Sequence, residues 1–363
     1  MATYKTIKYI VPTEVVEHTD SINALADVDT STASPTEGQT IKWNGTNWVP
    51  GDIEESASGT QKAIFGFGKS DSGGRTNITN LVSSSGVVAT DTTGVGTARS
   101  GLAAAGYGGD KALFGFGYSG SSGGRTNNTN LVSNTGVVST DTSGVGLVRL
   151  GLAASGYGGD KAIFGFGNSS SSTTNITNLV SNLGVVATDT TGVGTARGVL
   201  TATGYGSTGQ AIFGFGGTTA LGAVSVTNLV SSSGVVASDT TGVGSARYNL
   251  AASGYGGDKA IFGYGDTGQF STGYYENMTN LVSNTGVVAT DTTGVGTTRK
   301  ELAASGYGGD KAIFGYGFNE ADYNRSDFNL TNLVSNTGVV ALDTTGVGTG
   351  RYGLAAAGYS TTA

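Results

Sequence analysis

The sequence predicts an all-β protein built from stacked repeats, and three observations support this prediction. The 363 residues include 64 Gly together with many Thr, Val and aromatic residues, which suit short strands and tight turns. No stretch has the periodicity of a helix. One unit of roughly 50 residues recurs, and a period of this size marks a unit that must stack or close into a ring. Its AIFG-type motif occurs six times, beginning at Ala63, Ala112, Ala162, Ala211, Ala260 and Ala312.

Each repeat predicts four strands. In the second copy the first strand is the run at 102–108, and a Gly-Gly-Asp turn follows it. The second strand is the KAIFGFG motif, from which a loop of variable length leads to the third strand, TNLVS. A short SNTG-type turn leads to the fourth strand, GVVATDT, and the segment TGVGTAR crosses to the next repeat. Four short antiparallel strands in each repeat are the plan of a β-propeller blade.

The KAIFGFG strand predicts how neighbouring sheets pack. Under the two-residue alternation of a strand, Phe65 and Phe67 would share one face, and Gly66 and Gly68 would share the other. We expect the aromatic face of one sheet to press on the Gly-thinned face of its neighbour. Fully burying a Phe contributes about 1.5–3 kcal/mol, more than the roughly 0–1 kcal/mol of a surface salt bridge. Stacked rings should therefore dominate the stability.

The ends of the repeat region predict that the ring closes. The first copy begins at its second strand, at Lys62, and a surplus first strand follows the sixth copy at 351–359. Docking this strand beside residues 62–68 would complete six blades and cover an exposed edge. An open β-solenoid is the alternative, although it would not require the repeat to be cut at this point.

The repeats resemble those of kelch-type β-propellers. The matching positions are Arg99 before the first strand, the Gly-rich end of the second strand at 66–68, and the Asp-Thr-Thr stretch at 91–93. The resemblance covers residues 59–363. It departs from kelch repeats because FGFG replaces their glycine doublet and their Trp is absent. It implies a six-bladed kelch-like β-propeller of four-stranded blades, closed by the C-terminal strand.

Loop length and aromatic content vary at only one end of the predicted blades. This end carries the loop between the second and third strands and the crossing segment, and its two longest loops belong to the fifth and sixth copies. Exposed aromatic rings on neighbouring loops are typical of surfaces that bind sugars or proteins, and an Arg among them could bind an acidic group. The alternative is that these rings cover their own loops. The candidate ligand-binding residues are Phe270, Tyr274, Tyr275, Phe318, Tyr323, Arg325 and Phe328.

The sequence predicts no enzyme, cofactor or metal site. There is no Cys, and the single His, His18, lies outside the repeats, so thiolate chemistry is excluded and most general-base and metal sites are not expected. Sialidase-type Asp boxes are not matched, because the stretch at 90–94 has one residue too many and no Trp. Calcium at this turn is the minor alternative. We interpret the Asp and Arg residues that recur in step as turn caps and bridges between blades: Asp91, Asp141, Asp189, Asp239, Asp291 and Asp343, with Arg99, Arg149, Arg197, Arg247, Arg299 and Arg351.

The charge and the N-terminal residues limit the possible partners. A formal net charge of −7 with only 19 Lys and Arg argues against binding to nucleic acid. No apolar run approaches the length of a membrane span, and the first residues lack the apolar core of a signal peptide. We therefore expect neither nucleic-acid binding nor membrane insertion.

Residues 1–58 differ in composition from the repeats. Residues 1–20 predict a polar, β-branched anchoring arm, and residues 21–58 predict a connector. Within the connector, GQTIKWNGTNWVPGD predicts a β-hairpin turned at Asn44 and Gly45, with Trp43 and Trp48 on its arms. Two large aromatic side chains on so short a hairpin need a partner subunit or the edge of the propeller to bury them.

The hairpin segment and the LADVDT stretch at 25–30 resemble a segment common in tail-fibre and other appendage proteins of bacteriophages. The resemblance implies a homo-oligomeric virion structural protein that is assembled in the host cytoplasm. Its N-terminal residues, including Trp43 and Trp48, would contact other virion proteins. Its propeller would be exposed for adhesion to a host-surface glycan or protein. The alternatives are a free-standing glycan- or protein-binding propeller adaptor and a glycan-cleaving enzyme, which the missing set of paired Glu, Tyr and Asp residues disfavours.

Overall fold

The computed structural model is all-β in the part of the chain that it describes. The described residues contain strands and turns but no helix. Among them, no helix is therefore available that is long and apolar enough to cross a membrane. The chain divides into two units, 1–56 and 57–363, which we describe separately. The described residues are 39–43, 46–52, 60–120, 124–220, 222–268, 274–321 and 324–362.

The first unit contains the predicted hairpin. Strand β1 (Gln39–Trp43) pairs antiparallel with β2 (Trp48–Asp52), and the register places Trp43 opposite Trp48. This confirms the predicted pairing, although Asn44 and Gly45 of the predicted turn lie outside the described residues. The Trp48 side chain is 41% exposed. The arm predicted at 1–20 also lies outside the described residues.

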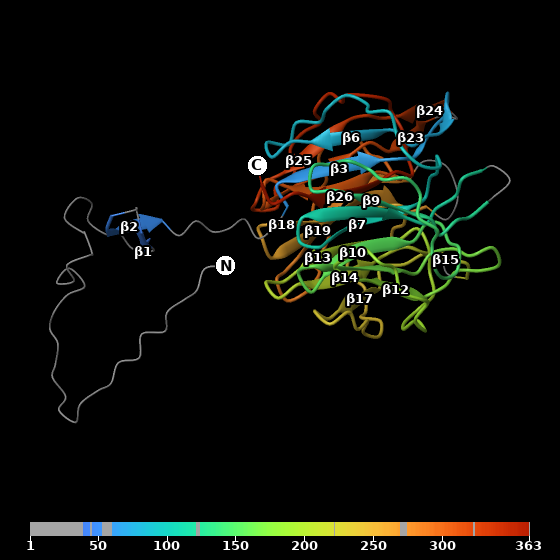
Figure 1. Ribbon diagram of the computed structural model, residues 1–363. Coiled ribbons are helices and arrows are strands. Elements are labelled where there is room, and N and C mark those ends of the chain that lie inside the picture. Colours follow the sequence, from blue (N-terminus) through green and yellow to red (C-terminus); the bar gives the residue numbers. More distant parts are fainter. Residues whose placement is uncertain are drawn as a thin grey trace. The chain divides into compact units, whose positions relative to one another are not determined.

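The second unit consists of small antiparallel sheets (Figure 1). Each repeat supplies a three-stranded sheet, and three of the loops between second and third strands contain a two-stranded ribbon. The sheets, in repeat order, are β26-β3-β6 (Ala355–Tyr359, Lys62–Gly66, Thr79–Val82), β7-β8-β9 (Ala103–Tyr107, Lys111–Gly115, Thr129–Val132), β10-β11-β12 (Ala153–Tyr157, Lys161–Gly165, Thr177–Val180), β13-β14-β17 (Thr201–Tyr205, Gln210–Gly214, Thr227–Val230), β18-β19-β20 (Ala251–Tyr255, Lys259–Asp266, Tyr275–Val282) and β21-β22-β25 (Ala303–Tyr307, Lys311–Gly315, Thr331–Val334). The ribbons are β4-β5 (Lys69–Ser70, Gly74–Arg75), β15-β16 (Gly217–Thr218, Gly222–Ala223) and β23-β24 (Phe318–Ala321, Asn324–Asp327).

The predicted fourth strand of each repeat is wrong, because this segment makes only isolated bridges. In the first repeat, Val88 bridges to the end of β6 and Thr92 bridges to its start. Between these bridges the Asn80 side-chain amide donates to the Ala89 carbonyl at 3.0 Å and to Asp91 Oδ1 at 2.9 Å. A side chain therefore occupies the place where a backbone ladder would continue. The same pair of bridges recurs in all six repeats, so the sheets are three-stranded.

The C-terminal strand pairs with the first repeat, as the sequence predicts. Strand β26 lies antiparallel to β3, with Tyr359 opposite Lys62 and Ala355 opposite Gly66. The first strands of successive sheets also contact one another, from β7 through β10, β13, β18 and β21 to β26, and β26 contacts β7 in turn. Segments from the two ends of the repeat region are thus held together without a covalent link.

Phe65 and Phe67 do not share one face, which corrects the sequence prediction. The Phe65 ring lies 5.1 Å from the Tyr316 ring of the sixth repeat, whereas the Phe67 ring lies 5.1 Å from the Phe114 ring of the second. The cause is the backbone at Phe67, whose φ of 63° is left-handed and reverses the alternation of the strand. Each repeat therefore places one aromatic ring against each of its two neighbours.

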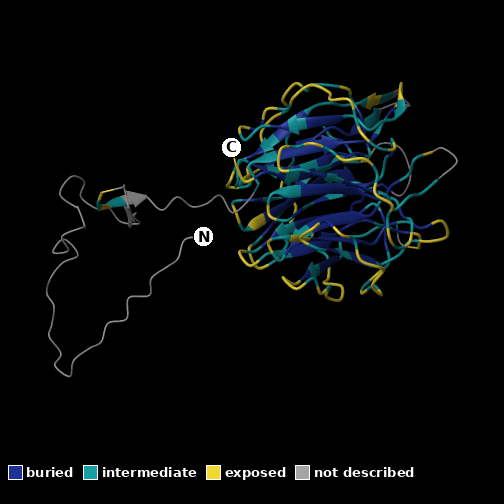
Figure 2. Cartoon of the chain, viewed as in Figure 1, coloured by how far each residue is buried: buried dark blue, intermediate teal, exposed yellow. Residues whose placement is uncertain are grey.

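The Gly-thinned face is confirmed as the surface that receives these rings. A Cβ atom added at Gly66 would lie 2.7 Å from Phe114 Cζ, a distance that real Cβ atoms do not adopt. The equivalent glycine in each of the other repeats lies against a Phe ring in the same way. Figure 2 shows the result, in which the strands of the repeats are buried and the exposed residues lie mainly in turns and loops.

The recurring Arg residues bridge neighbouring repeats, in agreement with the sequence interpretation. Arg99 is fully buried, and its guanidinium lies 4.4 Å from the centre of the Phe67 ring of the first repeat. It also donates to the Asn130 side chain and, at 3.5 Å, to Asp141 Oδ1 of the second repeat. Burial lowers the pKa of Arg99 to about 10, an effect that the charge of Asp141 opposes. Arg99 therefore stays charged at neutral pH.

Candidate functional site

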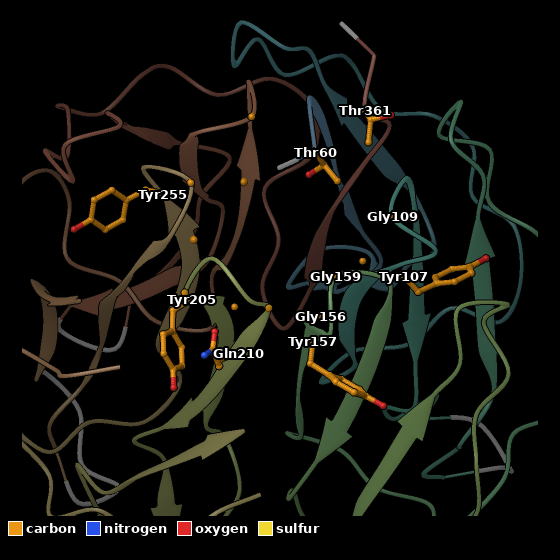
Figure 3. A pocket seen from close by; sticks show the side chains of 18 of the residues that line it. Thr60, Tyr107, Gly109, Gly156, Tyr157, Gly159, Tyr205, Gln210, Tyr255 and Thr361 are labelled. Carbon is orange, nitrogen blue, oxygen red and sulfur yellow. The ribbon is translucent and has the colours of Figure 1, made fainter. Parts of the chain in front are cut away.

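The residues at one end of the repeat unit are more similar among the six copies than the residues at the other end. At the end that carries the Gly-Gly-Asp turns, a cavity of about 300 Å³ is lined by equivalent Gly, Tyr and Lys residues of most repeats and by Thr60. Figure 3 shows that the rings of Tyr107, Tyr157 and Tyr205 point away from the centre of this cavity, which leaves backbone atoms as much of its lining. The lysines at its edge pair with the preceding Asp, as Lys111 does at 2.6 Å. The fourth repeat departs from the others at this end, because Gln210 replaces the Lys of the other copies in the lining.

At the opposite end, two residues differ from repeat to repeat. They follow each recurring Arg and precede the Leu before each first strand. The first of the two bridges to the loop between second and third strands, as Tyr248 does to Asp266 and Lys300 does to Phe318. The six pairs are Ser100 and Gly101, Leu150 and Gly151, Gly198 and Val199, Tyr248 and Asn249, Lys300 and Glu301, and Tyr352 and Gly353.

The second residues of these pairs form a closed cycle of six backbone hydrogen bonds. Each N–H donates to the carbonyl of the equivalent residue in a neighbouring repeat, over 2.6–2.9 Å. All six residues have a left-handed φ, between 50° and 63°. Three are Gly, whereas Val199, Asn249 and Glu301 place side chains at a φ that costs an L-residue roughly 1–2 kcal/mol. These three precede the first strands of the fourth, fifth and sixth sheets.

A cavity beside this cycle has a volume of about 540 Å³. It lies within the size range of ligand pockets, about 300–1,000 Å³. A second cavity of about 270 Å³ shares Val199 and Asn249 with it and adds Glu301. The lining of the larger cavity comes from loops of the third to sixth repeats: Asn168, Thr173, Val199, Gly217, Thr218, Thr219, Tyr248, Asn249, Tyr275, Lys300 and Glu320.

Lys300 is held by an acidic and an aromatic environment. Its ammonium lies 2.6 Å from Asp266 Oδ2, and the Asp266 side chain is only 1% exposed. The rings of Tyr248, Tyr275 and Phe318 surround the same ammonium, with centroids 5.0–5.8 Å away. The positive charge that Lys300 brings to the cavity is therefore largely balanced.

Two further ionisable groups at this end have raised pKa values. Burial raises the pKa of Glu301, while Lys300, Arg325 and Lys69 act in the opposite direction. Burial also raises the pKa of Tyr275, and the negative charge of Glu320 adds to that effect. Both shifts arise first from burial, which disfavours the charged form of each group.

Several of the residues predicted to bind a ligand pack against their own loops. Phe318 is 5% exposed, and its ring lies 4.9 Å from that of Tyr352. The Arg325 guanidinium lies against both rings, 3.6 and 3.5 Å from their centres, and Nε donates to Asp327 Oδ1 at 2.9 Å. Phe328 is partly buried, and its N–H donates to the Gly317 carbonyl. These contacts support the alternative in which Phe318 and Arg325 cover their own loops.

The tyrosines of the fifth repeat lie in different environments. Tyr275 lines the larger cavity, whereas Tyr274 is 55% exposed. Phe270 and Tyr323 lie outside the described residues. The sequence reasoning missed Tyr248, Asn249 and Lys300 as cavity residues. The available signal was the pair of residues between each recurring Arg and the following Leu, which changes in every copy.

Within the described ranges, no group of three or more His, Cys, Asp or Glu side chains is placed to hold a metal ion. The arrangement can instead supply aromatic faces, hydroxyl and amide groups, one neutralised cation and the Glu320 carboxylate. A comparison with protein-family models found no matching family, and a comparison with curated proteins found no match.

Proposed function

We propose that residues 57–363 form a six-bladed, kelch-like β-propeller. The proposal is supported by the contacts of β26 with both β21 and β7, and by its pairing with β3. Two cycles of backbone hydrogen bonds also pass through all six repeats, one at each end of the sheets. An open solenoid would separate its first and last repeats, because each repeat then contacts only its neighbours along the stack.

We propose further that the protein is a bacteriophage virion structural protein, either a tail fibre or another particle appendage, and not an enzyme. The observation that carries this proposal is the hairpin in which Trp43 lies opposite Trp48, within the segment that resembles phage appendage proteins. With 41% of Trp48 exposed, the hairpin offers an aromatic contact to another virion protein.

The place where the chain enters the repeat unit supports the same assignment. Thr60 lies at the end with the Gly-Gly-Asp turns, where its carbonyl accepts a hydrogen bond from the Gly309 N–H at 3.2 Å. The variable cavity lies at the other end. We propose that attachment uses residues 1–58 and that adhesion to a host-surface glycan or protein uses the variable end of the repeat unit.

The test measures incorporation of the full-length double variant Trp43→Ala, Trp48→Ala into phage particles. We expect incorporation to fall while the melting temperature of the repeat unit stays unchanged, because the two units are compact separately. Lys42→Ala in the same strand is the matched control and should incorporate normally. Normal incorporation of both the double variant and a chain that lacks residues 1–58 would favour the alternative, a free-standing glycan- or protein-binding adaptor.

A further inference from the structure

We propose that the cavity of about 540 Å³ binds a saccharide that is uncharged or carries an amino group, and that Val199 and Asn249 in its lining, with Glu301 in the lining of the adjoining cavity, determine its specificity. This inference rests on the proposed adhesive function, and it names the ligand class and the site. The argument has three steps: the chemistry of the lining, its charge, and the backbone strain beside it.

The lining suits a polyhydroxylated ring. Saccharides have C–H faces that pack on aromatic rings and hydroxyl groups that need hydrogen-bond partners. The cavity supplies the rings of Tyr248 and Tyr275, and hydroxyl or amide groups from Thr173, Thr219 and Asn249. Val199 is the one purely apolar side chain in the lining, but carbon atoms form most of the exposed lining surface, which suits the C–H face of a sugar ring.

The charge of the lining disfavours an acidic ligand. The cation in the lining, Lys300, is paired with Asp266 at 2.6 Å. The Glu320 carboxylate lines the same cavity. Both Glu301 and Arg75 line the adjoining cavity, so the charge argument applies to the larger cavity alone. Arg325, the cation predicted to bind an acidic group, lies against two aromatic rings and donates from Nε to Asp327, while its buried Nη2 has no hydrogen-bond partner among the described residues. An ammonium group on a ligand would be attracted here, whereas a carboxylate would be repelled.

The strained residues indicate that these three side chains serve a purpose other than folding. Repeats one to three place Gly at this position of the hydrogen-bonded cycle, and Gly adopts a left-handed φ without strain. Val199, Asn249 and Glu301 adopt the same φ on three consecutive repeats, and all three remain partly exposed. Strained residues that persist without being buried in the core are typical of binding sites. Both cavities contain Val199 and Asn249 in their linings.

The test uses the triple variant Val199→Gly, Asn249→Gly, Glu301→Gly in the full chain. Because the other three repeats already carry Gly here, we expect the variant to fold and to melt at or above the wild-type temperature. Binding is measured on a glycan array that holds neutral, amino-bearing and acidic oligosaccharides. Wild-type protein should bind neutral or amino-bearing members, and the triple variant should bind them at least tenfold more weakly. Asp160→Asn with Lys161→Gln, at the opposite end, is the matched control and should bind as wild type.

A single change separates the charge argument from the shape argument. Glu320→Gln keeps the size of the side chain and should reduce binding to amino-bearing members more than binding to neutral members. Wild-type binding to acidic members alone, or to no member of the array, would overturn the inference. So would a triple variant that folds and binds normally.

These outcomes are distinguishable from failure of the proposed function. If wild-type particles adsorb to host cells but the protein binds no saccharide, adhesion stands and the saccharide site is rejected. If the protein binds saccharides but never joins a particle, the site stands and the assignment as a virion protein is rejected.

Discussion

Removing residues 351–363 should abolish cooperative folding of the repeat unit. The deletion removes strand β26 and Leu354, the residue directly before it. Leu354 is 6% exposed and Tyr359, the last residue of β26, is 2% exposed, so both are buried in the intact protein. Deleting a buried Leu side chain costs about 2–5 kcal/mol and a buried aromatic about 3–5 kcal/mol, so these two alone cost roughly 5–10 kcal/mol. The total stability of a typical domain is about 5–15 kcal/mol. The deletion also removes Arg351, which donates from Nη2 to Asn80 Oδ1 at 2.7 Å, and exposes the edge of β3.

The assay is thermal unfolding followed by near-ultraviolet circular dichroism, with urea unfolding as a second probe. A rescue variant places residues 351–359 directly before Lys62, joined by the Gly-Gly-Asp turn that links Tyr107 to Lys111 in the second repeat. This variant should recover a cooperative transition, because it restores the pairing of β26 with β3. An unchanged melting temperature after the deletion would refute the reasoning, since the last strand would then add nothing to the first sheet.

Three further predictions concern the interior. Gly165→Ala should destabilise the fold by about 1–3 kcal/mol through overpacking, because its Cβ would lie 2.7 Å from Phe213 Cζ. Gly106→Ala, in a strand where the added Cβ would meet only ordinary contacts at 3.5 Å or more, is the matched control, and an equal loss there would contradict the packing argument. Arg99→Lys should lower the free energy of unfolding in urea by about 3–5 kcal/mol. A Lys ammonium cannot replace the whole guanidinium, so the buried Asn130 amide or the Asp141 carboxylate would lose a partner. A loss below about 1 kcal/mol would argue against the bridge. The third prediction concerns pH, because the pKa of Asp141 is lower in the folded protein than its ordinary value. The stability that Asp141 contributes should be fully present above the ordinary Asp pKa and should be lost as the pH falls through the lower pKa of the folded protein. Burial alone would raise the pKa of Asp141, but hydrogen bonds and Arg99 outweigh burial and lower it. The urea midpoint should therefore decrease from pH 6 to pH 3, less so in Asp141→Asn, and identical midpoints would contradict the linkage.

Local sequence patterns predict much of this fold because the same pattern of strands and turns recurs in six copies. The first three strands of each repeat, the hairpin at Trp43 and Trp48, and the pairing of the last strand with Lys62–Gly66 all follow from the sequence. The two errors arise from single residues that alternation cannot anticipate. The left-handed Phe67 turns its ring to the other neighbour, and the Asn80 side chain interrupts the ladder to the fourth segment.

The candidate site was less predictable because it depends on how the repeats are brought together. Tyr248, Tyr275 and Glu320 are far apart in sequence and lie in one cavity only because the repeats pack side by side. Loop length drew attention to Phe318 and Arg325, yet the Phe318 ring packs on Tyr352 and the Arg325 guanidinium lies against both rings. Aromatic content alone does not distinguish a ring that binds a ligand from a ring that packs on its own loop. Exposure and ion pairing in the folded protein provide that distinction.

The repeated interior explains how three strained residues are tolerated on one side of the unit. Each repeat buries two aromatic rings against its neighbours, and each buried ring contributes about 1.5–3 kcal/mol. The three left-handed side chains cost roughly 1–2 kcal/mol each, which is a small fraction of that stabilisation. Because the hydrogen bonds of the cycle use backbone atoms alone, residues other than Pro can differ at these positions without removing a donor or acceptor of the cycle. The residues at the variable end can therefore differ from repeat to repeat while the interior stays constant. In repeats four to six, these differing residues include polar and aromatic side chains that line one cavity.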